Sequence, residues 1–284
     1  MALIPSLEIE SRLQERLSAP MVWSELCEVK YTNTGVVKNP YLTDATLQTG
    51  TRYSAIAGTA AVTTDESVTV NNYEYAFQVV DDADLAQRSF SDFMEIADNM
   101  ATILDEGMET AMLAEHAQFT NFDNASIGGA AGNITVSLSN IKNIITGVKR
   151  EIREAGGHKK AMEKGIFVQW READFELVEQ LAASEGFNMA DLALKNGIKQ
   201  GFEYMGVEHY STSKNVAGHV FAGVKKCFNA YVVTSTYGKV KTIVNPYVTS
   251  ATGIISGVGL ESRIDREFKA WTKNVPVLFD VLVA

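Results

Sequence analysis

Cysteine and proline are scarce in this sequence, which has two cysteines and five prolines among 284 residues. Cys27 and Cys227 stand far apart and belong to no CxxC motif, which excludes a disulfide framework and a cysteine-rich zinc site. Free cysteine is among the most buried residue types. We therefore expect two buried free thiols and a reducing, cytoplasmic compartment.

Long apolar runs are also missing. A membrane-spanning helix needs about 18 or more consecutive apolar residues, whereas candidates such as residues 56–62 are interrupted by glycine and threonine. The first 17 residues lack a basic start followed by an apolar stretch. The sequence therefore predicts neither a membrane span nor a secretion signal.

Basic residues are in deficit. The 25 lysines and arginines face 35 aspartates and glutamates, which gives a net charge of −10. Affinity for nucleic acid normally comes from basic side chains that neutralise phosphates, so this balance disfavours a nucleic-acid reader. Hydrophobic residues make up 46% and charged residues 21% of the chain, a composition typical of a folded protein with a sizeable core.

The charge is unevenly distributed. Residues 81–116 carry ten acids and one base, Arg88, whereas residues 142–164 carry seven bases and three acids. Opposite charge on two segments of one chain favours contacts between copies or between domains, and solvated helix faces are the alternative.

Local motifs for catalysis or metal binding are absent from the sequence. No GxSxG nucleophile elbow occurs, and the glycines of GIISGVGLES do not have GxGxxG spacing. The acids of residues 106–115 form no ExxH pair. The four histidines have no i, i+4 spacing and no neighbouring carboxylates of the kind that a metal site needs, so we expect each to be a surface or core residue; they are His116, His158, His209 and His219. The sequence thus predicts no catalytic, cofactor or metal site and no enzyme.

Alternating residues predict strands in the first third of the chain. Val68 and Val70 alternate with polar residues, and an aromatic series from Tyr73 to Val79 follows with the same period of two, which indicates strands with one covered face. A strand is also expected near residues 35–38. Residues 44–65 between them are too many for a turn and predict an extended loop or a two-stranded arm that projects from the body.

The hydrophobic period changes to 3.6 after residue 80. Residues 93–112 carry apolar side chains at three- and four-residue spacing, which predicts an amphipathic helix of about 28 residues, roughly 42 Å long. Gly107 in its middle indicates close packing or a slight bend. The first 20 residues form a short amphipathic arm that packs elsewhere.

An α/β lobe is expected in mid-chain, after a hinge loop at residues 121–132. A helix over 141–152, capped by Ser139 or Asn140, precedes a strand at 166–169 and a helix around 175–181. Later strands are expected at 202–210, 219–223, 230–234, 239–244 and 275–283. The fold class is α+β.

The order of these parts resembles the major capsid protein of tailed bacteriophages, which has the Hong Kong 97-type fold. Three stretches carry the resemblance: VKNP at residues 37–40 with the loop that follows it, the run TRYSAIAGTAAVTTDESVTVNNYEYAFQVVDDADLAQ at 51–87, and the helix MEIADNMATILDEGMETAML at 94–113. Further along, VKREIREAGG, GIFVQWREADFELVEQL and NGIKQGFEYMGVEHYSTS are similar to the axial domain of that family.

The resemblance implies a division of the chain into five parts. Residues 1–35 are an N-terminal arm, and 36–80 are the E-loop hairpin with its return strand. Residues 81–132 are a peripheral domain with the long spine helix, 133–240 are the axial domain, and 241–284 are strands that return to the peripheral domain.

The resemblance also implies a structural function. Such a coat protein self-assembles into hexamers and pentamers of an icosahedral head that encloses double-stranded DNA without sequence-specific binding. It is located in the virion, and in the host cytoplasm during assembly, with a scaffolding protein, a portal and decoration proteins as partners. No lysine occurs between Asn39 and Ile141, so a covalent lysine–asparagine cross-link from the E-loop is not expected. The family-like body begins within about 35 residues, which favours a separate scaffold or none.

Two alternatives remain open at this point: an encapsulin-like compartment with a protein cargo, and a soluble cytoplasmic enzyme with an unrecognised site. For the capsid interpretation, residues of the hairpin, the long helix and the lobe are expected at subunit interfaces. They are Asp44, Arg52, Tyr53, Glu106, Glu109, Asn196 and Lys199.

Overall fold

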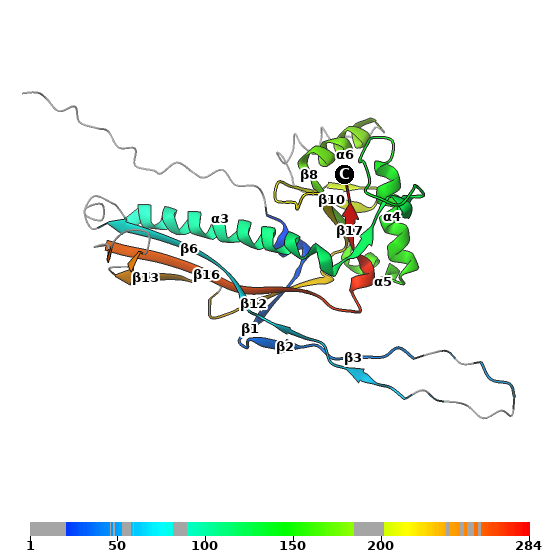
Figure 1. Ribbon diagram of the computed structural model, residues 1–284, viewed down its shortest axis with the longest axis horizontal. Helices are drawn as coiled ribbons and strands as arrows, with labels where there is room; N and C mark the ends of the chain where they lie inside the picture. Colours follow the sequence, from blue (N-terminus) through cyan, green and yellow to red (C-terminus); the bar gives the residue numbers. More distant parts are fainter. Residues whose placement is uncertain are drawn as a thin grey trace, which may run out of the picture.

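A computed structural model describes most of the chain: residues 21–45, 47, 49–52, 58, 60–81, 90–184, 202–236, 239–244, 247–248, 253–254 and 257–284. The predicted N-terminal arm therefore lies largely outside the described residues. The rest forms a long helix on a sheet, an α/β lobe and a projecting hairpin (Figure 1). Within these ranges no helix combines the length and the apolar character needed to cross a membrane.

The first sheet has five strands in the order β1-β12-β16-β13, with β6 also paired to β16. Its central strand is the 14-residue β16 (Gly257–Ala270), which pairs over its longest stretch, antiparallel, with β6 (Asn72–Asp81). Strand β12 (Phe228–Val233) pairs with β16 and, in parallel, with β1 (Glu28–Thr32), while β13 (Val240–Val244) forms an edge.

The long helix α3 (Phe90–Ala114) has 25 residues and confirms the predicted amphipathic helix. It lies along β6 and β16 (Figure 1). A Cβ atom on Gly107 would stand 3.2 Å from Cγ of Glu74 in β6, so the close packing expected at this glycine is confirmed. Arg266 of β16 donates to the Glu74 carboxylate at 2.6 Å.

Strand β6 has one covered face, but it is the face opposite to the aromatic series that the alternation marks as apolar. Ala76 and Val80 are buried, whereas Tyr73, Tyr75 and Phe77 are exposed. Helix α3 thus covers the face with small side chains, and the aromatic face is left open in the single chain.

The lobe contains a six-stranded sheet in the order β7-β17-β11-β8-β10-β9. Its strands are β7 (Thr120–Phe122), β8 (Ile166–Arg171), β9 (Phe202–Tyr204), β10 (Val207–Thr212), β11 (His219–Val224) and β17 (Leu278–Leu282). Three helices accompany this sheet, namely α4 (Ile141–Glu154), α5 (His158–Lys164) and α6 (Glu172–Ser184). The expected mid-chain α/β lobe is therefore present.

Local details of the lobe differ from the sequence predictions. The strand expected over 202–210 is a hairpin of β9 and β10, because Met205 and Gly206 adopt positive φ angles of 54° and 69° and reverse the chain. The C-terminal strand begins three residues later than expected, after a short 3-10 turn, η3 (Val275–Val277), with a proline at its start. At the start of α4, Asn140 occupies the N-cap position, yet its side chain accepts from the backbone N–H of Ser137 instead of capping the helix.

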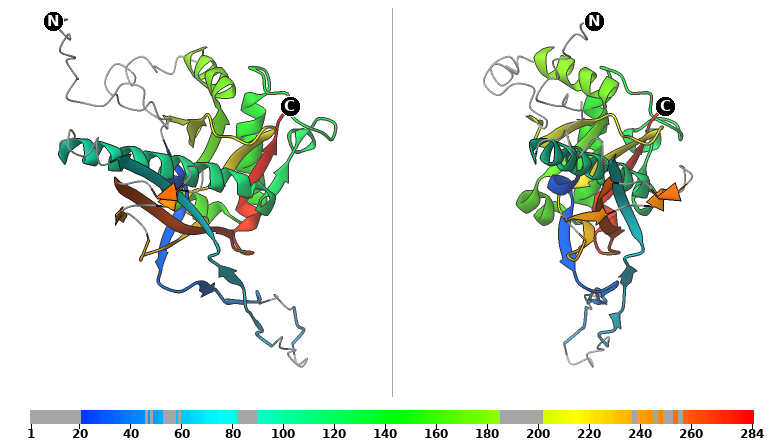
Figure 2. Two further views of the ribbon diagram at one scale, coloured as in Figure 1. Left: turned by 60° about the vertical axis from the view of Figure 1, so that its left-hand side comes forward. Right: turned by 90° about the vertical axis from the view of Figure 1, so that its left-hand side faces the viewer.

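The projecting hairpin is built from two short antiparallel pairs. Strand β2 (Val36–Lys38) pairs with β5 (Ser67–Thr69), and β3 (Tyr41–Leu42) pairs with β4 (Thr63–Thr64). The hairpin points away from the sheet, the long helix and the lobe in all three views (Figures 1 and 2). Residues 44–65 were expected to form an extended loop or a two-stranded arm; the paired strands flank this segment, and only β4 lies within it.

Each sheet is assembled from distant parts of the chain. The lobe sheet contains β7 and β17, which lie outside residues 133–240, whereas β12 lies within that range and joins the other sheet. The short elements α1 (Trp23–Leu26), η1 (Glu115–Gln118), η2 (Asn124–Ile127), β14 (Tyr247–Val248) and β15 (Gly253–Ile254) connect or extend these layers.

Candidate functional site

The short helix α1 is bound at its N-terminal end by a glutamate of the long helix. The backbone N–H groups of Val22 and Trp23 donate to Oε2 of Glu109 at 3.1 and 2.8 Å, and Gln169 of β8 donates to the other carboxylate oxygen. The first N–H groups of a helix have no partner within the helix, so a buried carboxylate is a suitable acceptor there. Glu109 thereby joins α1, α3 and the lobe.

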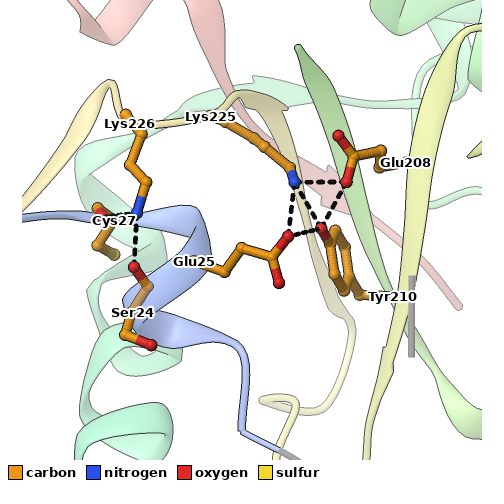
Figure 3. A network of polar contacts seen from close by, with 7 residues as sticks. All are labelled: Ser24, Glu25, Cys27, Glu208, Tyr210, Lys225 and Lys226. Atoms are coloured by element: carbon orange, nitrogen blue, oxygen red, sulfur yellow. Dashed lines mark hydrogen bonds and ion pairs between the residues drawn. The ribbon is translucent and has the colours of Figure 1, made fainter. Parts of the chain in front are cut away.

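The other end of α1 is bound by the turn between β11 and β12. Lys226 Nζ donates to the carbonyl oxygens of Ser24 and Cys27 at 2.6 and 2.8 Å (Figure 3). Its backbone N–H donates to the carbonyl oxygen of Leu26. Lys226 has a positive φ of 55°, which lets its backbone and side chain reach the same helix. Both ends of α1 are thus satisfied by distant residues.

A polar network continues from α1 into the lobe. Lys225 Nζ lies 3.0 Å from Oε1 of Glu25 and 2.5 Å from Oε2 of Glu208, and it donates to the hydroxyl of Tyr210 (Figure 3). That hydroxyl lies 2.7 Å from an oxygen of each carboxylate. The Lys225 side chain is 9% exposed, and a buried ammonium of this kind requires opposite charge close by.

The network shifts the protonation equilibria of its members. Burial, and then the carboxylates of Glu208 and Glu25, raise the pKa of the Tyr210 hydroxyl well above its ordinary value. Burial acts to raise the pKa of Glu25, but the bonds from Tyr210 and Lys225 outweigh it, so this pKa lies below the ordinary value. The charged carboxylate and the neutral phenol are therefore the stable forms, and the network serves to connect segments.

The base of the hairpin is attached to the turn that follows β16. Lys273 Nζ pairs with the carboxylate of Asp44, and the Thr272 hydroxyl and N–H donate to Glu66 at 2.7 and 3.2 Å. Val68 of β5 packs in a small buried cluster with Tyr231 and Trp271. These contacts fix the point from which the hairpin leaves the sheet.

The residues expected at subunit interfaces fall into different environments. Arg52 is exposed on the hairpin, and Asp44 is exposed at its base, where it pairs with Lys273. Glu106 is largely buried and accepts from Lys214 at 3.1 Å. Tyr53, Asn196 and Lys199 lie outside the described residues.

Glu109 requires a correction, because it is fully buried and both of its oxygens are used within the chain. In the last turns of α3, Glu106, Met108, Glu109, Met112 and Leu113 are all buried. This end of the helix is enclosed on more sides than its first half. An acid at a position that the amphipathic pattern predicts to be exposed is therefore buried here. A subunit contact through Glu109 does not fit this geometry.

The four histidines were expected to be surface or core residues, and two of them fit this description directly. His158 is exposed, and His209 is a core residue whose Nδ1 accepts from Trp170 Nε1 at 3.0 Å. His116 and His219, by contrast, lie beside a carboxylate, with Nδ1 of each near Oδ2 of Asp280 at 3.3 and 2.8 Å. The sequence analysis missed this cluster because the three residues come from three distant segments with no local spacing to reveal them.

The two thiols agree with the expectation from composition. Cys27 and Cys227 are free and buried, and burial raises the pKa of both thiols. A low thiolate population makes a cysteine a poor nucleophile, so their role here is packing.

Comparison with solved structures connects this architecture to viral shells. A chain from a structure of Mycobacterium phage Che8 superposes with a TM-score of 0.70 at 15% identity, covering 98% of this chain and 97% of that chain. A chain from the capsid of a native GTA particle gives 0.66 at 11% identity, covering 99% and 96%. A chain from the mature capsid of bacteriophage PhiM1 gives 0.62 at 13% identity, covering 98% and 92%. The chain therefore shares the mixed α and β fold of these chains.

The capsid fold covers nearly the whole chain, so the helix, the sheets, the lobe and the hairpin belong to one architecture. Identities of 11–15% to these chains are too low to transfer residue roles. No protein-family model and no curated protein matches this sequence. The evidence on function is therefore the fold and the surfaces that the single chain leaves exposed.

Proposed function

We propose that this chain is the major capsid protein of a tailed bacteriophage, a structural subunit and not an enzyme. It assembles into hexamers and pentamers of an icosahedral head that encloses double-stranded DNA. The observation that carries the proposal is the end-to-end agreement with chains from phage and GTA capsids, which extends over 98% of this chain and 97% of the Che8 chain.

The open surfaces of the chain support assembly. The hairpin exposes apolar side chains at Leu42, Leu47 and Val62, and β6 exposes Tyr73 and Tyr75 on its uncovered face. Exposed apolar groups concentrated on projecting or uncovered elements are typical of surfaces that a neighbour covers. A closed shell provides such neighbours for every copy.

We assign a mechanical role to each part, following the Hong Kong 97-like arrangement. The hairpin within residues 36–80 is an E-loop that lies over an adjacent subunit, and α3 is the spine helix that stiffens the outer part of the capsomer. The axial domain, expected over residues 133–240, meets its copies at the capsomer centre, with β17 as a strand of its sheet. Strands β12, β13 and β16 belong to the peripheral part, and the arm of residues 1–35 reaches across to a neighbour.

The charge of the chain suits a container for DNA. A net charge of −10 keeps the subunit from binding strongly to phosphates, because adhesion to DNA depends on basic side chains. DNA is enclosed without specific contacts, with a separate scaffolding protein, a portal and decoration proteins as partners. The shell is held by non-covalent contacts in the virion, after assembly in the host cytoplasm.

Arg52 provides a test of the hairpin contact. It is the one base in the sequence between Lys38 and Arg88, and we assign it a pairing with acids of a neighbouring subunit. Arg52→Glu should reduce the yield of closed shells on a density gradient while the melting temperature of the unassembled chain stays unchanged. Lys239→Glu is the matched control, because this lysine is exposed, precedes β13 and lies outside both the hairpin and the basic segment of residues 142–164. Equal shell yields for wild type and Arg52→Glu would contradict the pairing.

The contents of purified particles test the head function itself. Particles from the producing cells should hold nuclease-protected double-stranded DNA. Particles that hold a protein cargo and no DNA would contradict the phage-head proposal and favour an encapsulin-like compartment.

A further inference from the structure

Two imidazoles and one carboxylate meet where the long helix reaches the lobe. His116 lies in η1, directly after α3, His219 begins β11, and Asp280 lies in the neighbouring strand β17. The Nδ1 atoms of His116 and His219 lie 3.3 and 2.8 Å from the same oxygen, Oδ2 of Asp280. The potential ligand atoms of the three side chains all lie within 4.8 Å of one another.

The carboxylate of this cluster is buried, whereas both imidazoles are partly exposed, so an ion from solvent has access to the ligand atoms. The Asp280 side chain is 2% exposed, whereas those of His116 and His219 are 25% and 24% exposed. A buried carboxylate needs compensating positive charge or hydrogen bonds. The two imidazoles shield the carboxylate from bulk water, and their exposed edges leave a route to it.

We propose that His116, His219 and Asp280 form a binding site for Zn²⁺, with the fourth coordination position taken by water. This goes beyond the shell function proposed above and does not depend on it. Zinc in proteins takes histidine nitrogen and carboxylate oxygen ligands at about 2.0–2.2 Å in tetrahedral geometry. Such bonds separate ligand atoms by roughly 3.4 Å. The nitrogen–oxygen distance at His116 is 3.3 Å, whereas the hydrogen-bond distance of 2.8 Å at His219 must lengthen when the ion binds.

The chemistry of the donor set selects the class of ion. Imidazole nitrogen suits zinc and its first-row neighbours, whereas Mg²⁺ and Ca²⁺ prefer sites made entirely of oxygen. Two histidines with one aspartate therefore favour Zn²⁺ over the two commoner divalent cations. The acidic chain, with a net charge of −10, also attracts cations in general.

Binding requires a small rearrangement of the rings. The two imidazoles stack with centroids 3.7 Å apart and an interplanar angle of 29°, and two rings bound through nitrogen to one tetrahedral ion stand further apart. The rings must rotate away from each other, and each Nδ1 must give up its proton to become a ligand. The ion would then join the end of α3 to the C-terminal strand of the lobe.

Isothermal titration of ZnCl₂ into the untagged, chelator-treated full-length chain tests the site. We expect one ion per chain, little heat from MgCl₂ or CaCl₂, and a higher melting temperature with zinc. His219→Ala and the double variant His116→Ala/His219→Ala should lose at least about tenfold in affinity. His158→Ala is the matched control, since it removes an exposed histidine outside the cluster and should bind as wild type does.

A spectroscopic readout reports the ligands directly. Co²⁺ in place of zinc should give the visible absorption of a four-coordinate ion in the wild-type chain and in His158→Ala, and not in the double variant. Three results would overturn the proposal: no stoichiometric zinc binding, unchanged affinity in a double variant with a wild-type circular dichroism spectrum, or an equal loss in His158→Ala.

Discussion

In the α/β lobe, four consecutive residues of β8, from Phe167 to Trp170, are buried, whereas in the hairpin Leu42 and Leu47 are exposed, the latter by 98%. The lobe strand has neighbours on both edges, β11 and β10, and helices nearby. The hairpin has its own two-stranded ladder and a base attached at Thr272 and Lys273. The lobe strand is enclosed by the buried core that the lobe shares with α3 and the first sheet, whereas the apolar side chains of the outer hairpin stay exposed in the single chain.

Among the variants that test the contrast between lobe and hairpin, Trp170→Ala in the lobe should cause the largest loss of stability. Trp170 is fully buried, and its Nε1 donates to His209. Removing the ring leaves a cavity and a buried histidine without its donor, which should lower the free energy of unfolding by about 3–5 kcal/mol. Urea denaturation of the unassembled chain measures this loss. Trp170→Phe should cost less because most of the volume remains, and a loss under about 1 kcal/mol for Trp170→Ala would show that the lobe core is not the main source of stability.

Acidification should weaken the lobe through His209. Burial lowers the pKa of this imidazole from 6.5 to about 4, so the unfolded chain binds more protons between these values. The contribution of neutral His209 to the free energy of unfolding is fully present above pH 6.5 and is lost as the pH falls toward 4. At about 1.4 kcal/mol per pKa unit this amounts to about 3 kcal/mol.

The comparison of wild type with His209→Gln separates the pH-dependent loss of stability caused by His209 from the losses caused by other titrating groups. A glutamine can accept from Trp170 and donate to the Tyr204 carbonyl, yet it does not titrate. Urea midpoints measured at pH 7 and pH 4.5 should fall further for wild type than for the variant. Parallel decreases in the two proteins would contradict the assignment of His209 as a neutral core residue.

A smaller effect is expected from Glu109→Gln, which acts on the attachment of α1. The amide has one accepting oxygen instead of two and carries no charge, so it cannot keep all three bonds from Val22, Trp23 and Gln169, and the bonds that it keeps are weaker. The loss should be about 1.5–3 kcal/mol. Asp98→Asn, an exposed acid on the same helix, should stay within about 0.5 kcal/mol of wild type. Hydrogen exchange at residues 22–27 should rise in Glu109→Gln, and unchanged exchange there would argue that this carboxylate does not hold the short helix.

The smallest effect on stability is expected from Leu47→Ser in the hairpin. An exposed side chain contributes little to the unassembled chain, so its free energy of unfolding should change by less than about 0.5 kcal/mol. Shell yield, by contrast, should fall, because the proposed contact of Leu47 is with another subunit. A variant that loses stability as a monomer yet assembles normally would reverse the roles given to lobe and hairpin.

Elements with a regular local pattern could be predicted from the sequence. The period of 3.6 in residues 93–112 and the period of two in residues 67–79 correspond to α3 and to strands β5 and β6. The hairpin followed from the length of the segment between strands. These predictions succeeded because each depends on residues close together in the chain.

Features that depend on distant residues could not be predicted in this way. Strand β16 mixes glycine, charged and apolar residues, and its length is explained by its partners β6, β12 and β13. The burial of Glu109 follows from the lobe that encloses the end of α3. The meeting of His219 and Asp280 follows from the pairing of β11 with β17, which no spacing in the sequence reveals.

Electron microscopy of the purified full-length chain in negative stain, at high protein concentration, tests the central claim most directly. The account predicts closed particles or hexameric and pentameric capsomers, because the hairpin and the aromatic face of β6 find neighbours only in an assembly. A stable monomer of about 31 kDa, with no capsomers or shells at any concentration, would contradict it.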